Sequence, residues 1–265
     1  MRLPSYLTLT ISLTAALALA VPALAQAQDP ERPPEAPVTP VTPTNPVEDC
    51  LELLPEPDQE QPVGTDDSDT ADGTEFAACV LEALTDVAGT THAAAIVAMV
   101  GAGIATGYPD GTFRPADRIS RAQMATMLDA ALDLDPSVSG ELPDDVDPDS
   151  VHADAIAAIL EAGISQGRAD GSFGPNDPVS RGQMAAFLDN AGLVDELSEG
   201  VTVELPEDVK GTVHEDAIAG LLGNGIARGF NDGTFRPADA VNRGQMATFI
   251  ITALGLDHFQ LPELP

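Results

Sequence analysis

Hydrophobic residues recur at helical spacing in three similar stretches of the chain. The segments "AAAIVAMVGAGI", "ADAIAAILEAGI" and "EDAIAGLLGNGI" each place large apolar side chains at positions i, i+3, i+4 and i+8. This pattern predicts an amphipathic helix with one buried stripe. A glycine precedes the last isoleucine each time (Gly103, Gly163 and Gly225), and it predicts the helix end, because glycine readily adopts the left-handed backbone of a C-terminal cap.

A second amphipathic helix follows in each stretch, after a turn-rich loop. The loops "TGYPDGTFRPAD", "QGRADGSFGPND" and "RGFNDGTFRPAD" share one large apolar residue, which we expect to anchor the loop to the core. That residue is Phe113, Phe173 or Phe235. Each second helix should follow a good N-cap residue, and a glutamine three residues later predicts a capping box in the two units that have serine. The N-caps are Ser120, Ser180 and Asn242.

The three helix-loop-helix units lie about sixty residues apart, and no strand pattern of any length interrupts them. A unit of this size cannot bury two helix stripes by itself, whereas three packed units can. We therefore predict one all-α domain made of three units, which span residues 74–141, 142–204 and 205–265.

The start of the chain has the pattern of a secretory signal peptide. Met1 and Arg2 precede an apolar run too short to span a bilayer, and small residues ending at Ala25 suit cleavage. We expect residues 1–25 to be the signal peptide and residues 26–73, rich in proline and acids, to be a disordered linker. No later stretch is long and apolar enough to cross a membrane, so we expect a secreted protein.

The only two cysteines, Cys50 and Cys79, fall in the part of the chain that is expected to be exported. An oxidising compartment favours a disulfide between them, and two unpaired thiols are the alternative. Neither cysteine has the neighbours of a metal site or a catalytic thiol.

The chain is strongly acidic, with 11 Lys and Arg against 43 Asp and Glu and a formal net charge of -32. This charge argues against nucleic acid and anionic membrane surfaces as partners. It suits either simple solubility or salty surroundings that screen the self-repulsion.

The motifs of each unit occur in a fixed order: an acidic Asp-Val segment, an Ala-Ile helix, Gly-Ile, an Asp-Gly-Thr-Phe-x-Pro loop, and a helix start such as Ser-Arg-x-Gln. This order resembles the S-layer homology (SLH) domain, in three copies, and the Arg-Gly-Gln-Met-Ala version resembles the form of exported actinobacterial proteins. The resemblance implies a pseudo-threefold helical bundle. It also implies that grooves between the units bind cell-wall polysaccharide, often carrying acidic pyruvyl groups. The chain departs from the family because Gln replaces the Glu of the helix-start motif.

Three arginines at the helix starts are the main candidates for binding a glycan: Arg121, Arg181 and Arg243. An arginine in the first turn opposes the helix dipole by roughly half a kcal/mol, so it does not stabilise its own helix. Together with free N–H groups at that terminus, its guanidinium would form a site for a carboxylate or ketal acid. The alternative is a structural ion pair with one of the nearby acids.

Four other residues are candidates for the same role. Three glutamines could contact a sugar or could only cap their helices. They are Gln123, Gln183 and Gln245. Tyr108 could stack on a sugar face or could only cover its loop. The second unit has Arg168 at the position of Tyr108 and Gly174 in place of a loop arginine, which predicts that this unit is the weakest binder.

Nothing in the sequence is typical of catalysis, whether a Ser, His and Asp set, a phosphate-binding loop or a distinct pair of carboxylates. The histidines His92, His152 and His214 fall on separate units, so we expect no metal or cofactor. We expect a non-catalytic protein of the cell surface whose partner is a cell-wall secondary polysaccharide or a peptidoglycan-linked glycan. The alternative is a secreted module for protein-protein interaction or self-assembly of a surface layer.

Overall fold

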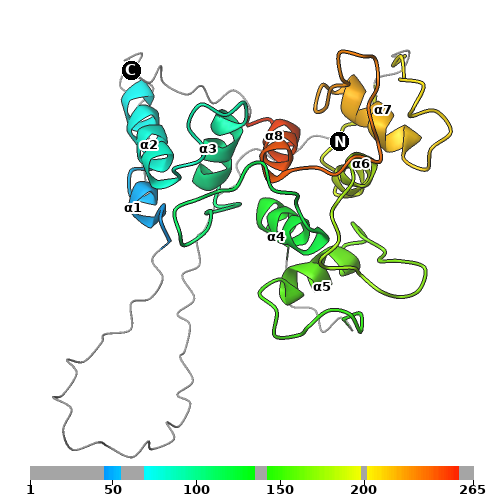
Figure 1. Ribbon diagram of the computed structural model, residues 1–265, viewed down its shortest axis with the longest axis horizontal. Coiled ribbons are helices and arrows are strands. Elements are labelled where there is room, and N and C mark those ends of the chain that lie inside the picture. The colour runs from blue at the N-terminus through cyan, green and yellow to red at the C-terminus, as the bar shows by residue number, and fades with distance from the viewer. Residues whose placement is uncertain (1–44, 55–68, 135–141, 198–201, 257–265) are drawn as a thin grey trace, which may run out of the picture.

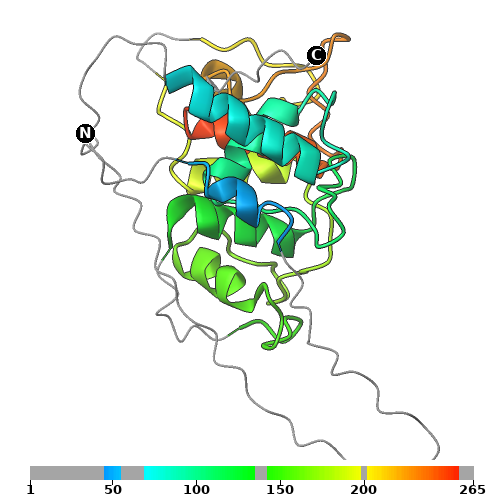
Figure 2. The ribbon, with the colours of Figure 1, turned by 90° about the vertical axis from the view of Figure 1, so that its left-hand side faces the viewer.

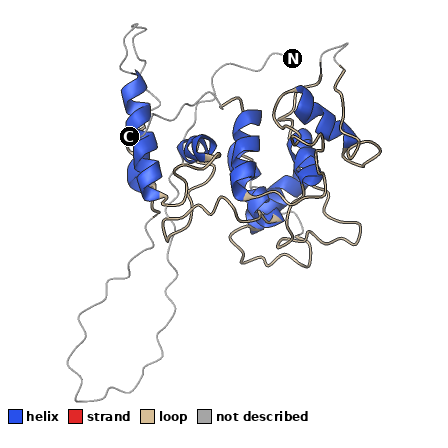
Figure 3. Cartoon of the chain, turned by 45° about the horizontal axis from the view of Figure 1, so that its top comes forward, coloured by secondary structure: helices blue, strands red, loops and turns tan. Residues whose placement is uncertain are grey.

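The computed structural model describes residues 45–54, 69–134, 142–197 and 202–256, and within these ranges it contains eight α-helices and no strand (Figure 3). The helices are α1 (Glu48–Leu51), α2 (Asp69–Ala83), α3 (Ala93–Gly101), α4 (Arg121–Leu132), α5 (Ala153–Glu161), α6 (Arg181–Asn190), α7 (Glu215–Gly223) and α8 (Arg243–Ala253). The predicted all-α class is confirmed. The expected signal peptide lies outside the described residues. None of the described helices is long and apolar enough to cross a membrane.

The three units close into a ring. Units 1, 2 and 3 contribute the helix pairs α3 and α4, α5 and α6, and α7 and α8. The second helix of each unit packs against the first helix of the next, because α4 contacts α5, α6 contacts α7, and α8 contacts α3. The second helices therefore lie at the centre, with the first helices around them (Figure 1).

Three short backbone segments meet at the centre of the ring, each just before a second helix. The N–H of Ile119 donates to the carbonyl of Val241 (3.0 Å), that of Val241 to Val179 (2.9 Å), and that of Val179 to Ile119 (3.1 Å). All three side chains are fully buried. This triangle of hydrogen bonds fixes the three helix starts relative to one another.

The hydrophobic core is formed by the predicted stripes. The stripe residues of the first helices are buried except for the partly exposed Leu160 and Leu222. Those of the second helices are all buried: Met124, Met127, Leu128, Met184, Phe187, Leu188, Met246, Phe249 and Ile250. The loop residues Phe113, Phe173 and Phe235 are fully buried, as their role as anchors requires. The glycines at the ends of the first helices have positive φ angles near 70°, which confirms the predicted caps.

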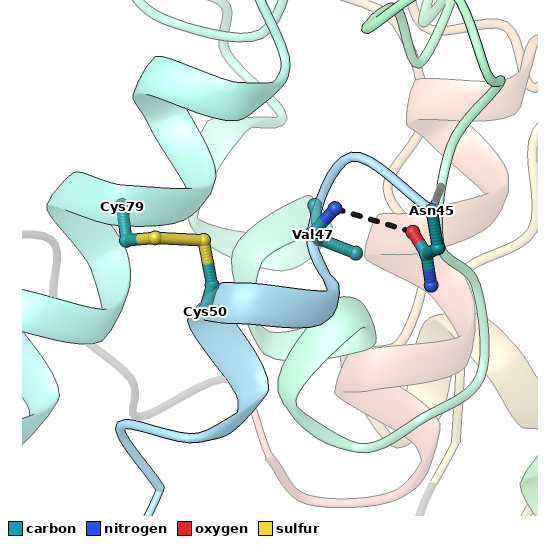
Figure 4. Close-up of a disulfide and its surroundings, with 4 residues drawn as sticks. All are labelled: Asn45, Val47, Cys50 and Cys79. Atoms are coloured by element: carbon teal, nitrogen blue, oxygen red, sulfur yellow. Dashed lines mark hydrogen bonds between the residues drawn. A yellow bond between two sulfur atoms is a disulfide. The ribbon is translucent and has the colours of Figure 1, made fainter. Parts of the chain in front are cut away.

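Helices α1 and α2 lie outside the ring, with α2 packed on α3 and α1 packed on α2 (Figure 2). A disulfide joins Cys50 of α1 to Cys79 of α2 (Figure 4). The Asn45 side chain accepts a hydrogen bond from the Val47 N–H (3.2 Å), and Val47 and Cys50 are buried. The segment 26–73, expected to be a disordered linker, therefore includes two structured parts, residues 45–54 and residues 69–73 at the start of α2. The disulfide and the packing of α1 on α2 hold the first of these parts in place.

Candidate functional site

The three candidate arginines are the first residues of α4, α6 and α8, and the helix starts around them are capped. The N-cap side chain accepts from the backbone N–H of the glutamine, and the glutamine Oε1 accepts from the N-cap N–H. The capping box occurs in the third unit too, and not only in the two units with serine, because Asn242 Oδ1 accepts from the Gln245 N–H (2.7 Å). Capping therefore secures each helix start without help from the arginine.

The free N–H groups expected at these termini are not available, and that part of the prediction is wrong. The Arg121 N–H donates to the Asp177 carbonyl (2.9 Å) and the Ala122 N–H to the Pro175 carbonyl (3.0 Å), both in the loop of unit 2. The same two bonds join unit 2 to unit 3 and unit 3 to unit 1. Each second helix is thus docked by its N-terminus onto the neighbouring unit, and an anion would have to be recognised by side chains.

Each arginine side chain crosses into the next unit and is buried there. The side chains of Arg121, Arg181 and Arg243 are only 5%, 4% and 6% exposed. Their Nε atoms donate to the carbonyls of the anchoring phenylalanines at 2.7–2.8 Å. The guanidinium also lies 4.3–4.7 Å from the centre of that phenylalanine ring, close enough for a cation-π contact. We call these three places the 1–2, 2–3 and 3–1 interfaces, after the units that meet there.

The buried arginines have no anionic partner among the described residues. The ion pairs in the described ranges involve only exposed or half-exposed side chains, and none includes Arg121, Arg181 or Arg243. The expected structural alternative, an ion pair with a nearby acid, is therefore absent from this part of the chain. Burial lowers the pKa of all three guanidinium groups, because it disfavours the charged form. These cations are held in the protein at a cost in solvation.

Three of the sequence candidates meet at the 3–1 interface. Tyr108 of unit 1 lies 4.9 Å from the Arg243 guanidinium of unit 3, measured to the ring centre. The Tyr108 hydroxyl accepts a hydrogen bond from Gln123 Nε2 (3.1 Å). At the 2–3 interface, Phe230 takes the place of Tyr108 and lies 5.1 Å from the Arg181 guanidinium. Both interfaces therefore present an aromatic ring beside a buried cation.

Three aspartates, one in each Asp-Val segment, hold the loops in place, a role that the sequence patterns did not predict. Asp145 accepts from the N–H groups of Phe173 (2.8 Å) and Gly174 (2.7 Å), and Asp86 and Asp208 bind the equivalent loops in the same way. These carboxylates fix the loop that carries the anchoring phenylalanine. The only signal in the sequence was the recurrence of Asp-Val at the same place in each unit.

The histidines contribute to the unit interfaces. His92 Nδ1 hydrogen bonds Thr248 Oγ1 of unit 3, and His152 Nδ1 hydrogen bonds Thr126 Oγ1 of unit 1, both at 2.8 Å. His214 lies against Gly182, where a Cβ would meet its ring. Within the described ranges, no group of three or more His, Cys, Asp or Glu could hold a metal ion.

The fold and its site define a closed ring of three helical repeats whose interfaces each hold a buried arginine. Residues 83–125, 144–185 and 207–247, one stretch in each unit, match the S-layer homology domain. The chain therefore carries three S-layer homology domains, as its motifs predict.

Several relatives share this region. The chain is 28% identical over 156 residues to a cellulosome-anchoring protein of Acetivibrio thermocellus, a match that covers 56% of this chain and 34% of the relative. It is 30% identical over 153 residues to an S-layer protein of Bacillus licheniformis, covering 57% and 17%. It is 34% identical over 161 residues to an endoglucanase of a Bacillus species, covering 57% and 16%. The chain thus spans about a third or less of these relatives. Together with the three domains, the matches place it among secreted proteins of the cell wall or cell surface.

Proposed function

We propose that the three interfaces bind acidic groups of a cell-wall polysaccharide and that this binding anchors the chain, without catalysis, at the cell surface. One observation carries the proposal: each interface buries an arginine that has no carboxylate partner in the described residues. A lone buried cation is unfavourable unless an anion completes its environment. An acidic sugar substituent is an anion that an exported protein meets at the wall, and the guanidinium fork suits a carboxylate.

The remaining candidates divide according to their contacts. Tyr108 lies beside Arg243, and the Arg114 guanidinium also lies 3.9 Å from its ring centre, so Tyr108 can contact a sugar only through the part of the ring that these two arginines leave uncovered. The glutamines Gln123, Gln183 and Gln245 act first as helix caps, so we assign them an indirect part through the position of the helix start. The relatives named as cellulosome-anchoring and S-layer proteins support an anchoring role for the shared region.

The test is co-sedimentation of the full chain with purified cell walls, before and after chemical removal of their secondary polymer. The parent protein should sediment with intact walls and stay in solution with stripped walls. The triple variant R121Q/R181Q/R243Q should lose at least about tenfold in affinity, because each replaced arginine removes a charge-assisted contact. Equal binding to intact and stripped walls, or full binding by the triple variant, would refute the proposal.

A matched control keeps the change in charge but leaves the interfaces intact. Arg118, Lys210 and Arg228 are exposed cations, and the variant R118Q/K210Q/R228Q lowers the net charge by the same amount. It should bind walls like the parent protein. Because a buried arginine can be needed for folding, each triple variant is checked by circular dichroism. Competition by soluble acidic wall fragments against the parent protein tests the same idea without a substitution.

A second candidate function is self-association. Val151 and Val213 occupy equivalent positions in units 2 and 3 and are 90% and 94% exposed. Sedimentation equilibrium of the full chain decides this, since a monomer at all concentrations tested excludes assembly through this surface.

A further inference from the structure

Unit 2 departs from its two sister units at several positions, and three of these lie around Arg121 at the 1–2 interface. Ser165 stands where units 1 and 3 have alanine, Arg168 stands where they have Tyr108 or Phe230, and Gly174 stands where they have arginine. Ser165 is 5% exposed, and its Oγ is 3.5 Å from Arg121 Nη2. The three substituted positions are therefore neighbours in the structure, all close to Arg121.

Arg168 and Gly174 depend on each other. A Cβ at position 174 would overlap the terminal atoms of the Arg168 side chain, so any other residue there would require the Arg168 guanidinium to shift from this position. The backbone there has a positive φ of 71°, close to the 58° of Arg114 and Arg236 at the same position. Unit 2 has therefore kept a cation in its loop and lost the aromatic ring.

The cation of unit 2 also has a different partner. Arg114 pairs with Asp110 at the tip of its own loop, and Arg236 pairs with Asp232 in the same way, both at 2.7 Å. Arg168 pairs instead with Asp177, the residue whose carbonyl accepts the Arg121 N–H. The acid whose backbone carbonyl holds the start of α4 is therefore neutralised at the 1–2 interface.

In the described part of the chain, the aspartates equivalent to Asp177 have no arginine partner at the other two interfaces. Asp117 and Asp239, the counterparts of Asp177, form no ion pair with the described residues. The charge of Asp117 opposes the effect of burial on the pKa of Arg243, and Asp239 does so for Arg181. Asp145 does the same for Arg121, and a loop arginine lowers the pKa of the buried arginine at every interface: Arg168 for Arg121, Arg236 for Arg181 and Arg114 for Arg243. The 1–2 interface differs because Arg168 stands in the place of the aromatic ring, whereas Arg114 and Arg236 lie 3.9 and 4.0 Å from the ring centres of Tyr108 and Phe230.

We propose that the 1–2 interface is a separate anion subsite, formed by Arg121, Arg168 and Ser165, that takes a compact dianion such as a phosphate group. The two interfaces with rings take the sugar acid. This inference rests on the proposed function, because it divides the acidic groups of one wall polymer among three interfaces. The two guanidinium groups can only donate hydrogen bonds, and the Ser165 hydroxyl can turn its O–H toward a ligand. This set of donors suits the oxygens of a phosphate group.

The test follows the Nε–Hε signals of the three buried arginines by ¹⁵N NMR in the full chain, during titration with inorganic phosphate or with acetate at constant ionic strength. Each signal is assigned with a single Arg→Lys variant. Phosphate should move the Arg121 signal at about tenfold lower concentration than the Arg181 and Arg243 signals, because Arg168 and Ser165 replace the ring and the alanine of the other two interfaces and add hydrogen-bond donors beside Arg121. Acetate should show no such preference.

Two reciprocal variants test the residues responsible. R168Y/G174R installs the pair of unit 1 in unit 2 and should remove the phosphate preference of Arg121. Y108R/R114G does the reverse in unit 1 and should confer the preference on Arg243, which faces that loop. The variant S165A keeps both charges and should weaken phosphate binding at Arg121 by a factor of about three, the effect of one lost hydrogen bond.

The inference is overturned if phosphate moves none of the three signals, if all three respond at the same concentration, or if R168Y/G174R leaves the Arg121 titration unchanged. The parent protein alone supplies the first two comparisons, so a variant that fails to fold does not remove the test. Wall binding is measured separately. Its absence in the parent protein would reject the proposed function and leave the phosphate preference readable.

Discussion

The central triangle predicts that the three units unfold together, and the substitution Val179→Ala tests this. Val179 is fully buried, and its backbone joins units 1 and 3 through the hydrogen bonds to Ile119 and Val241. The substitution removes two methyl groups, a transfer loss of about 1.6 kcal/mol at roughly 0.8 kcal/mol per group. A residual cavity of about 50 Å³ adds about 1.2 kcal/mol. We therefore expect the free energy of unfolding to fall by about 2–3 kcal/mol, and Tm by about 5–10 °C.

The assay combines thermal unfolding with amide hydrogen exchange of all three units. In a closed ring, loss of packing at the centre should lower the protection of units 1, 2 and 3 alike. Val241→Ala should cause a loss of the same size, because Val241 holds the equivalent position in the triangle. Val213→Ala is the matched control, since the same atoms are removed from a side chain that is 94% exposed, and it should change stability by less than about 0.5 kcal/mol. A loss of protection confined to unit 2 would refute the cooperative ring.

Three other measurements test separate parts of the structure. Replacing Cys50 and Cys79 by serine opens a disulfide with a sequence separation of 29, which should cost about 3.5 kcal/mol in denaturant unfolding. Burial lowers the pKa of His92 and His152, so the unfolded chain binds protons before the folded chain does as the pH falls below about 6.5. Melting curves should therefore show Tm decreasing below about pH 6.5, and this decrease should be smaller in His92→Gln. Hydrogen bonds from the Phe173 and Gly174 N–H groups lower the pKa of Asp145. The contribution of Asp145 to stability is therefore present above about pH 4 and is lost as the pH falls further. Asp145→Asn should lower the free energy of unfolding at pH 7 by about 1 kcal/mol, a value reduced because the carboxylate is exposed to solvent.

Much of the fold follows from local patterns in the sequence. The helix stripes, the glycine caps and the N-caps each depend on residues within about two turns of one another, so periodicity and capping preferences suffice to predict them. The capping box of Asn242 and Gln245 was missed because the expected pattern was limited to serine, although the asparagine side chain accepts the same hydrogen bond.

The arrangement of the units does not follow from such patterns. An amphipathic stripe shows that a helix is buried on one side, but not which helix covers it. The packing of α8 on α3 joins residues far apart in the chain, and the hydrogen bonds to the α4 N-terminus come from a different unit. For the same reason, the sequence could single out Arg121 but could not show that its N–H groups are occupied. It also could not show that Arg168 lies over Gly174.

The position of the arginines links the stability of the ring to ligand binding. Each one stands at the positive end of a helix, is buried, and lacks a carboxylate among the described residues, so three separate effects oppose it. The carbonyl and ring of the anchoring phenylalanine offset part of this cost and at the same time join two units. An anion that binds at one interface offsets the rest in the folded state only, because the unfolded chain does not bring the two units together. Ligand bound at any interface therefore stabilises the whole ring, and a wall polymer that occupied several interfaces would do so more strongly.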